Sequence, residues 1–206
     1  METEYITSDL LKNTLTLTGT TFADVDIAFA TKSASRAIDL LCQRHFYMDD
    51  DTAQVRYYTP GRQTELEIDD LVTLTSLQTD TDGDGTFEQS WTLNTDFVLE
   101  PFNALSNAAD PWPYTLIRVH PAGSYVLPTT GYPRTVKVTG KFGWPVGVPD
   151  AVVDATTLLA NRLLTIKRSA PLGIVAFDGG AVRIARADQS VMMLVGNYMK
   201  HRVAVA

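Results

Sequence analysis

The chain has 206 residues, of which 45% are hydrophobic and 20% are charged, and its formal net charge is −7. This composition is sufficient for one substantial hydrophobic core, or for one core with a smaller satellite. No apolar run approaches the ~18 residues that would suggest a membrane span, so no membrane-spanning helix is expected. The acidic start, residues 1–4, does not resemble a secretory signal, and the single cysteine, Cys42, cannot form an internal disulfide. We therefore expect folding in a reducing, cytoplasmic compartment.

The charge is unevenly distributed along the chain. Residues 1–149 contain 20 acidic and 10 basic side chains, whereas residues 150–206 contain 4 acidic and 7 basic ones. A general DNA-binding protein needs a basic surface to release counterions, so the acidic body argues against that class. The mildly basic end favours contact with an acidic partner, although basic residues are also common near helix ends.

Two helices are predicted at the beginning. Thr7 or Ser8 is placed to cap a short helix, and Gly19 ends that segment. A long helix is predicted over residues 24–44, because its apolar side chains recur every three or four residues. Cys42 follows this apolar stripe and is expected to pack as a small apolar group.

From residue 55 the period of the hydrophobic pattern changes to two, which is typical of strands. Turn residues such as Pro60-Gly61 and Asn94-Thr95 separate the segments. The expected strands cover residues 55–59, 65–68, 72–79, 87–93, 97–100, 116–120, 124–126 and 135–140.

A second long helix is predicted from Pro149-Asp150 to Lys167-Arg168, and a last helix over about residues 187–202. The fold class is therefore α+β, with a helical core formed by N- and C-terminal helices and an inserted antiparallel β-rich module. The expected organisation is residues 1–50 and 149–170 for the helical core, 51–148 for the β-rich module, and 171–206 for a C-terminal arm and helix.

The acidic segment at residues 80–85, Asp-Thr-Asp-Gly-Asp-Gly, matches the first half of an EF-hand loop. Asp80, Asp82 and Asp84 are thus candidate calcium ligands. The twelfth position, where an EF-hand carries a bidentate glutamate, is Trp91. A tight turn between two strands explains the same residues, and we favour that interpretation.

The sequence contains no recognisable catalytic constellation. His45, His120 and His201 have no spacing typical of metal ligands or of a base beside a nucleophile, and there is no Gly-x-Ser-x-Gly or phosphate-binding motif. We expect no enzyme activity and no cofactor.

Three ordered blocks resemble the head–tail connector, or adaptor, proteins of long-tailed bacteriophages. The first is residues 24–46, with Ala-Ile-Asp and a closing Cys-Gln-Arg-His-Phe; the second is residues 66–71, followed by the acidic turn and Trp91. The third is Val-Thr-Gly-Lys-Phe-Gly-Trp at 138–144, followed by Val148-Pro149 and the helix at 155–162. The blocks span residues 24–165, and the resemblance fades after residue 165.

This resemblance implies a structural virion protein that forms a ring, commonly of twelve copies, below the portal at the neck of the particle. Such a ring extends the DNA channel without binding DNA specifically and docks a stopper or tail protein. The implied partners are therefore the portal, neighbouring copies and the next neck or tail component, with no membrane and no catalytic residues. The chain would be synthesised in the host cytoplasm.

The basic C-terminal segment is the candidate contact with the portal. The residues we single out there are Arg183, Arg186, Val191, Leu194 and Tyr198. A helix packed on its own subunit is the alternative explanation. Rival functions are another neck protein, such as a stopper or tail terminator, and a calcium- or sugar-binding β-module that would use the acidic turn with Trp91, Trp112 and Trp144.

Overall fold

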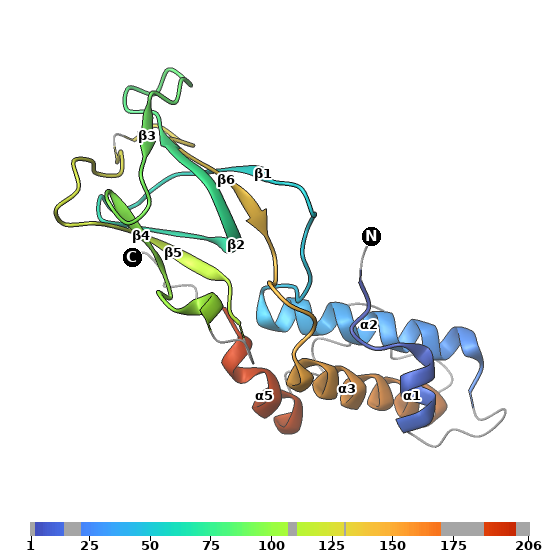
Figure 1. The fold of residues 1–206 in the computed structure, drawn as a ribbon. Helices are drawn as coiled ribbons and strands as arrows, with labels where there is room; N and C mark the ends of the chain where they lie inside the picture. Colours follow the sequence, from blue (N-terminus) through green and yellow to red (C-terminus); the bar gives the residue numbers. More distant parts are fainter. Residues whose placement is uncertain (1–2, 15–21, 107–110, 130, 170–187, 201–206) are drawn as a thin grey trace. The chain divides into compact units, whose positions relative to one another are not determined.

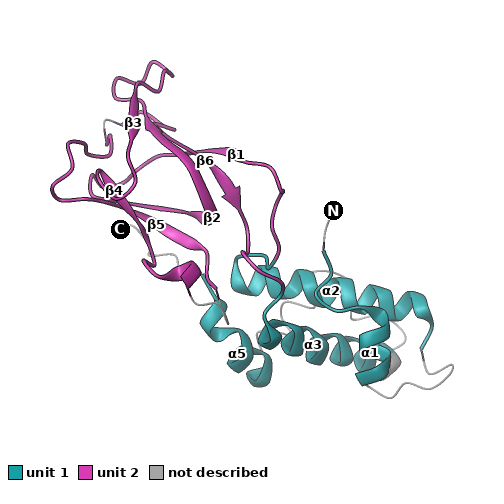
Figure 2. Ribbon diagram, in the orientation of Figure 1, with its two compact units in different colours: residues 1–46, 148–203 teal, residues 47–147, 204–206 magenta. Residues whose placement is uncertain are grey.

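The computed structural model of the chain describes residues 3–14, 22–106, 111–129, 131–169 and 188–200. The chain divides into two compact units: a helical unit, residues 1–46 and 148–203, and a β unit, residues 47–147 with 204–206 (Figure 2). The helices and the antiparallel six-stranded sheet confirm the α+β class.

The helical unit is organised around two long helices, α2 (Asp24–Cys42) and α3 (Asp150–Ser169), which lie side by side and run in opposite directions (Figure 1). Lys167, near the end of α3, forms an ion pair with Asp26 at the start of α2. Both helices lie where the apolar spacing predicted them. α2 ends at Cys42 because Gln43 adopts a left-handed conformation, with φ 55°.

The core between these helices consists of small and branched side chains. Its fully or nearly fully buried members include Ile27, Ala30, Ala34, Ile38, Val152, Ala155, Leu159 and Leu164. The alanines allow α2 to approach its neighbours closely.

The short helix α1 (Ser8–Thr14) and the segment before it are attached to α2. Lys12 of α1 forms an ion pair of 2.6 Å with Asp24. The hydroxyl of Tyr5 donates a hydrogen bond to Asp39 and accepts one from the backbone N–H of Phe46. Burial, together with the charge of Asp39, raises the pKa of Tyr5 far above its usual value, so this hydroxyl remains a donor.

The C-terminal helix is shorter than predicted. Instead of one helix over residues 187–202, the structure has α5 (Gln189–Val195) followed by a 3-10 turn, η2 (Gly196–Tyr198). Gly196 and Asn197 have low helix propensity, which explains the early end.

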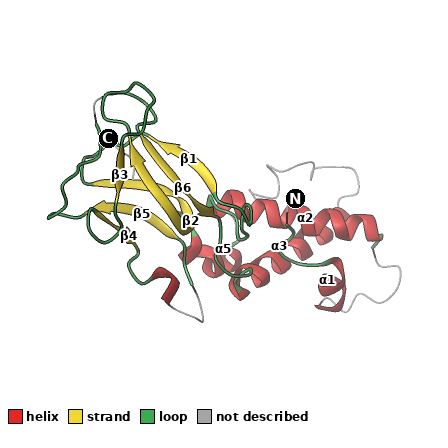
Figure 3. Cartoon of the chain, turned by 45° about the horizontal axis from the view of Figure 1, so that its top comes forward, coloured by secondary structure: helices red, strands yellow, loops and turns green. Residues whose placement is uncertain are grey.

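The β unit contains one antiparallel sheet in the order β1-β6-β2-β5-β4, with β3 also paired to β2 (Figure 3). The strands are β1 (Gln54–Tyr58), β2 (Glu65–Thr79), β3 (Gln89–Trp91), β4 (Phe97–Glu100), β5 (Tyr114–Val119) and β6 (Val136–Phe142). A 3-10 turn, η1 (Ala104–Ser106), lies between β4 and β5.

Three strand predictions need correction. Residues 65–68 and 72–79 belong to a single strand, β2, because register shifts around Leu71 and Leu74 absorb the Asp69-Asp70 interruption of the apolar alternation. The strand expected over 87–93 is limited to β3. Residues 124–126 form no strand: Val126 is exposed, and the following Leu127 N–H bonds to the carbonyl of Gln63 in a loop.

The glycines of the Gly-Lys-Phe-Gly-Trp block have structural roles at the end of β6. A Cβ on Gly140 would lie 2.2 Å from the carbonyl oxygen of Thr73 in the paired strand β2. Gly143 has φ +114°, and a Cβ there would lie 2.4 Å from the carbonyl oxygen of Tyr47. Only glycine fits the close backbone approach at residue 140 and the close approach with positive φ at residue 143.

Candidate functional site

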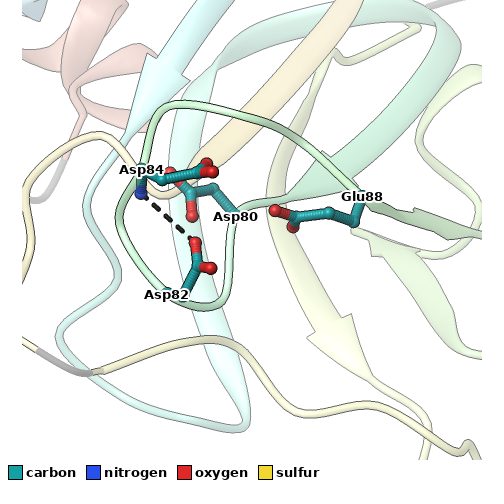
Figure 4. A group of neighbouring side chains, drawn as sticks. All are labelled: Asp80, Asp82, Asp84 and Glu88. Atoms are coloured by element: carbon teal, nitrogen blue, oxygen red, sulfur yellow. Dashed lines mark hydrogen bonds between the residues drawn. The ribbon is translucent and has the colours of Figure 1, made fainter.

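The acidic loop at residues 80–85 follows β2 directly and is held by its own backbone. Asp80 accepts hydrogen bonds from the N–H groups of Gly83 (2.7 Å) and Gly85 (2.9 Å), one on each carboxylate oxygen. Asp82 accepts from the N–H of Asp84 at 3.2 Å (Figure 4). These bonds are those of a tight turn rich in Asp and Gly.

Burial by itself would raise the pKa of Asp80, but the N–H groups of Gly83 and Gly85 outweigh that effect and lower it below its usual range. Asp80 is therefore a carboxylate at neutral pH. It is nearly inaccessible, with 3% of its surface exposed.

The structure brings a fourth carboxylate to this loop. One oxygen from each of Asp80, Asp82, Asp84 and Glu88 lies within 4.8 Å of the others (Figure 4). Glu88 was missed in the sequence, although it occupies the ninth position of the EF-hand pattern, where a ligand is common. Trp91, at the twelfth position, is buried, and its indole N–H donates to Thr79 at 2.9 Å. Calcium binding at this loop stays the alternative to the tight-turn interpretation that we favour.

The aromatic residues considered for sugar binding lie in the core of the β unit or at its margin. Trp91 and Trp144 are 7% and 2% exposed, and Trp112 packs edge-on against Trp144 with ring centroids 5.1 Å apart. A sugar platform needs an accessible ring face. Trp91 and Trp144 do not provide one in the β unit.

An open cavity of ≈ 420 Å³ in the β unit is lined by Gln63, Thr81, Gln89 and residues 124–129. These residues include no carboxylate, imidazole or amine, the groups on which general acid–base chemistry depends. Burial raises the pKa of Cys42 to about 12, so this thiol is not an activated nucleophile.

The residues proposed to contact the portal differ in their surroundings. Arg183 and Arg186 lie outside the described residues. Val191 is fully buried inside the helical unit, whereas Leu194 is partly exposed and Tyr198 packs edge-on against Phe46. The most exposed apolar side chain of α5, Met193 at 79%, was not singled out from the sequence.

A buried carboxylate links α5 to α3 in the helical unit. Asp188 accepts the backbone N–H groups of Ser190 and Val191, which caps α5, and its other oxygen lies 2.6 Å from the guanidinium of Arg162 on α3. The backbone N–H of Lys200 also donates to the carbonyl of Cys42. Residues 188–200 thus pack on their own unit.

The helical unit exposes apolar side chains on its long helices. On α2 these are Val25, Phe29 and Leu40, which are 78%, 58% and 55% exposed, and on α3 Leu158 is 37% exposed. Such residues on the outer faces of helices are candidates for contact with another protein. The sequence pattern identified only the buried stripes of both helices.

No family model and no curated protein matches the chain. Solved structures do match it over nearly its whole length. A chain from the neck of an empty gene transfer agent particle, computed with C6 symmetry, has a TM-score of 0.55 at 16% identity and covers 98% of this chain and 93% of its own. A chain from the neck of the native particle, computed with C12 symmetry, has a TM-score of 0.50 at 17% identity and covers 100% and 98%.

A third match is a chain from the virion of the native gene transfer agent particle, with a TM-score of 0.51 at 20% identity, covering 98% of this chain and 93% of its own. The chain shares its fold with components of these particles. Across the residues that the structure describes, none of the helices is both long and apolar enough to cross a membrane.

Proposed function

We propose that this chain is a structural neck protein of a tailed-phage-like particle. Its specific role is that of a head–tail adaptor, which forms a ring below the portal, extends the DNA channel and docks the next neck or tail component. The observation that carries this proposal is the match of nearly the whole chain to chains in gene transfer agent necks. The connector-like blocks in the sequence support the same role independently of the fold.

The ring is expected to contain twelve copies, as the resemblance implies. A neck structure computed with C12 symmetry is consistent with that number. Each copy would present one surface to the next, a heterologous contact that closes by rotation. The role requires no catalysis and places the protein in the virion.

DNA is expected to pass the ring without specific binding. The β unit contains 14 acidic and 6 basic side chains, a balance of −8. A surface of this sign repels phosphates and keeps DNA mobile. The acidic unit is therefore suited to line or border a DNA channel.

The C-terminal residues are proposed to contact the portal. Arg183 and Arg186 supply positive charge ahead of α5, and Met193, Leu194 and Tyr198 supply apolar surface. Val191 is not available for this contact while α5 packs on α3. Deletion of residues 170–206 should abolish binding to the portal; full binding by the truncated, folded protein would contradict this part of the proposal.

The decisive experiment measures mass and symmetry. The full chain should be purified alone and after co-expression with the portal protein encoded in the same genome, and then examined by native mass spectrometry and electron microscopy. We expect a closed ring bound to the portal. A chain that stays monomeric in both preparations, with no association with the portal, would overturn the adaptor role.

A further inference from the structure

The outer face of α2 combines apolar and basic residues in one line. Val25, Phe29, Lys32, Arg36 and Leu40 are separated by three or four residues, so their side chains share one face of the helix. Val25, Phe29, Lys32 and Leu40 are exposed, and Arg36 is half-buried beside Asp39. We call this set the α2 stripe.

The outer face of α3 has the opposite charge. Asp150, Asp154, Leu158, Asn161 and Thr165 are also separated by three or four residues. Asp150, Asp154, Leu158 and Thr165 are exposed, and Asn161 is half-buried. We call this set the α3 stripe. It is acidic near the start of α3 and carries one apolar side chain near its middle.

The two stripes cannot meet inside one copy. α2 and α3 pack on each other through their buried faces, which contain Ile38 and Leu159. The stripes lie opposite those faces and point away from each other. Neither stripe therefore covers the other within one copy, and a second copy of this chain offers the complementary stripe.

An antiparallel pairing matches the stripes in a single register. With Lys32 placed opposite Asp154, the position of Arg36 lies opposite Asp150, because both steps are four residues; Arg36 itself is held by Asp39 and by the carbonyl of Thr3 in its own copy. In the same register Phe29 meets Leu158. In this register residues 24–36 of α2 lie opposite residues 150–162 of α3, so the helices overlap over about two thirds of their length and Leu40 lies beyond the start of α3. Antiparallel helices also place the positive end of one dipole beside the negative end of the other.

We propose that the α2 stripe of one copy packs antiparallel against the α3 stripe of the next copy. This inference rests on the proposed ring and names the surface that closes it. The contact is heterologous, as a ring requires, because each copy uses α2 on one side and α3 on the other. It repeats between copies the antiparallel α2–α3 arrangement found within each copy, so helices would alternate in direction around the ring.

A charge exchange tests this pairing. Lys32→Glu alone and Asp154→Lys alone each place like charges opposite one another, and the repulsion weakens the contact between copies. We expect each single variant to raise the concentration for half-assembly by about tenfold or more. The double variant Lys32→Glu with Asp154→Lys restores the opposite charges and should assemble at close to the wild-type concentration.

The matched control is Glu67→Lys, which makes a similar change of charge at an exposed position of β2 in the other unit. It should assemble like the wild type. Circular dichroism confirms that each variant is folded. Rings that form normally from both single variants would overturn the pairing and leave the adaptor role intact, whereas a wild type that forms no ring with or without the portal protein would overturn both.

Disulfide trapping gives a second readout that does not depend on affinity. The only native cysteine, Cys42, is fully buried, so it leaves the surface free of thiols. Phe29→Cys with Leu158→Cys should give, after mild oxidation of the assembled protein, a ladder of covalent oligomers on a non-reducing gel. Phe29→Cys alone should give no such ladder. Rings that assemble from the double-cysteine variant without crosslinks would show that another surface joins the copies.

Discussion

The helical unit and the β unit differ in how they carry charge. The helical unit contains 10 acidic and 11 basic side chains and is nearly neutral, whereas the β unit has a balance of −8. In the helical unit side chains of opposite sign lie beside one another, as Arg36 with Asp39 and Lys167 with Asp26, while in the β unit a single sign predominates. A unit with both signs permits contact with another protein, and a surface of one sign suits the exclusion of nucleic acid.

The units also differ in their cores, and this difference provides independent probes. All three tryptophans, Trp91, Trp112 and Trp144, belong to the β unit. Tryptophan fluorescence therefore reports unfolding of the β unit alone. Far-ultraviolet circular dichroism reports mainly the long helices of the other unit.

The largest expected effect comes from the core of the β unit. Phe97 is fully buried and packs against Trp91, with ring centroids 6.3 Å apart. Phe97→Ala should destabilise the β unit by about 3–5 kcal/mol. In urea titrations, the fluorescence transition should move to lower denaturant, while the transition followed by circular dichroism keeps its wild-type midpoint.

The reciprocal variant, Leu159→Ala, removes a fully buried side chain of α3 and should lower only the helical transition, by about 2–5 kcal/mol. If either substitution shifts both transitions together, the two units unfold as one cooperative body and their separation into two stability units is wrong.

A smaller effect is expected at the close approach of β6 to β2. Gly140→Ala places a methyl group against the carbonyl oxygen of Thr73 and should cost about 1–3 kcal/mol, because a paired backbone has little freedom to move. Gly61 has no atom within 4 Å of an added Cβ, so Gly61→Ala is the control. Equal fluorescence midpoints for the two variants would mean that β6 and β2 accommodate the added methyl group without loss of stability.

How far the sequence predicted the structure depends on the type of element. The long helices were placed well because their apolar residues keep a helical period over many turns, and that signal is strong. The long strand β2 was divided in two because Asp69-Asp70 breaks the alternation, and a β-bulge has no simple sequence signature. The end of α5 was placed too late because the pattern continues past Gly196.

The candidate interaction surfaces were harder to predict than the fold. The spacing of Ile27, Ala30 and Ile38 identified the buried face of α2, and burial confirms it. Phe29 and Leu40 are as hydrophobic as core residues, so the sequence does not distinguish them, and only the packing shows that they remain exposed. Glu88, by contrast, stands at the ninth position of the EF-hand pattern, so its place near the acidic loop could have been predicted from the sequence.

The attachment of α5 should depend on Asp188. Asp188→Ala removes the helix cap and the partner of Arg162, and should destabilise α5 by about 1–2 kcal/mol. Hydrogen exchange over residues 188–200 should increase, with no change in the fluorescence transition of the β unit. Asp188→Asn keeps a capping oxygen and should give an intermediate increase; exchange unchanged in both variants would show that Val191 and Val195 hold α5 without the carboxylate.

A modest effect with a defined pH dependence is expected in the acidic loop. The pKa of Asp80 is lowered in the folded protein, so its contribution to stability is fully present above the ordinary carboxyl range and is lost as pH falls through the lower, folded value. Asp80→Asn cannot accept both N–H bonds and lacks this titration. Fluorescence midpoints of wild type and variant should therefore differ at neutral pH and converge in acid, and a constant difference would mean that the carboxylate charge is not involved.

The smallest expected effect is that of calcium on the same loop. Both oxygens of Asp80 already accept backbone N–H groups, and the buried Trp91 replaces the glutamate that closes an EF-hand. A site with a dissociation constant of ~10⁻⁴ M would stabilise the β unit by about 2.7 kcal/mol when the calcium concentration is a hundred times the dissociation constant. We expect no shift of the fluorescence melting temperature under that condition. If calcium without magnesium raises the melting temperature of the wild type but not that of the double variant Asp82→Asn with Asp84→Asn, the acidic loop is a calcium site.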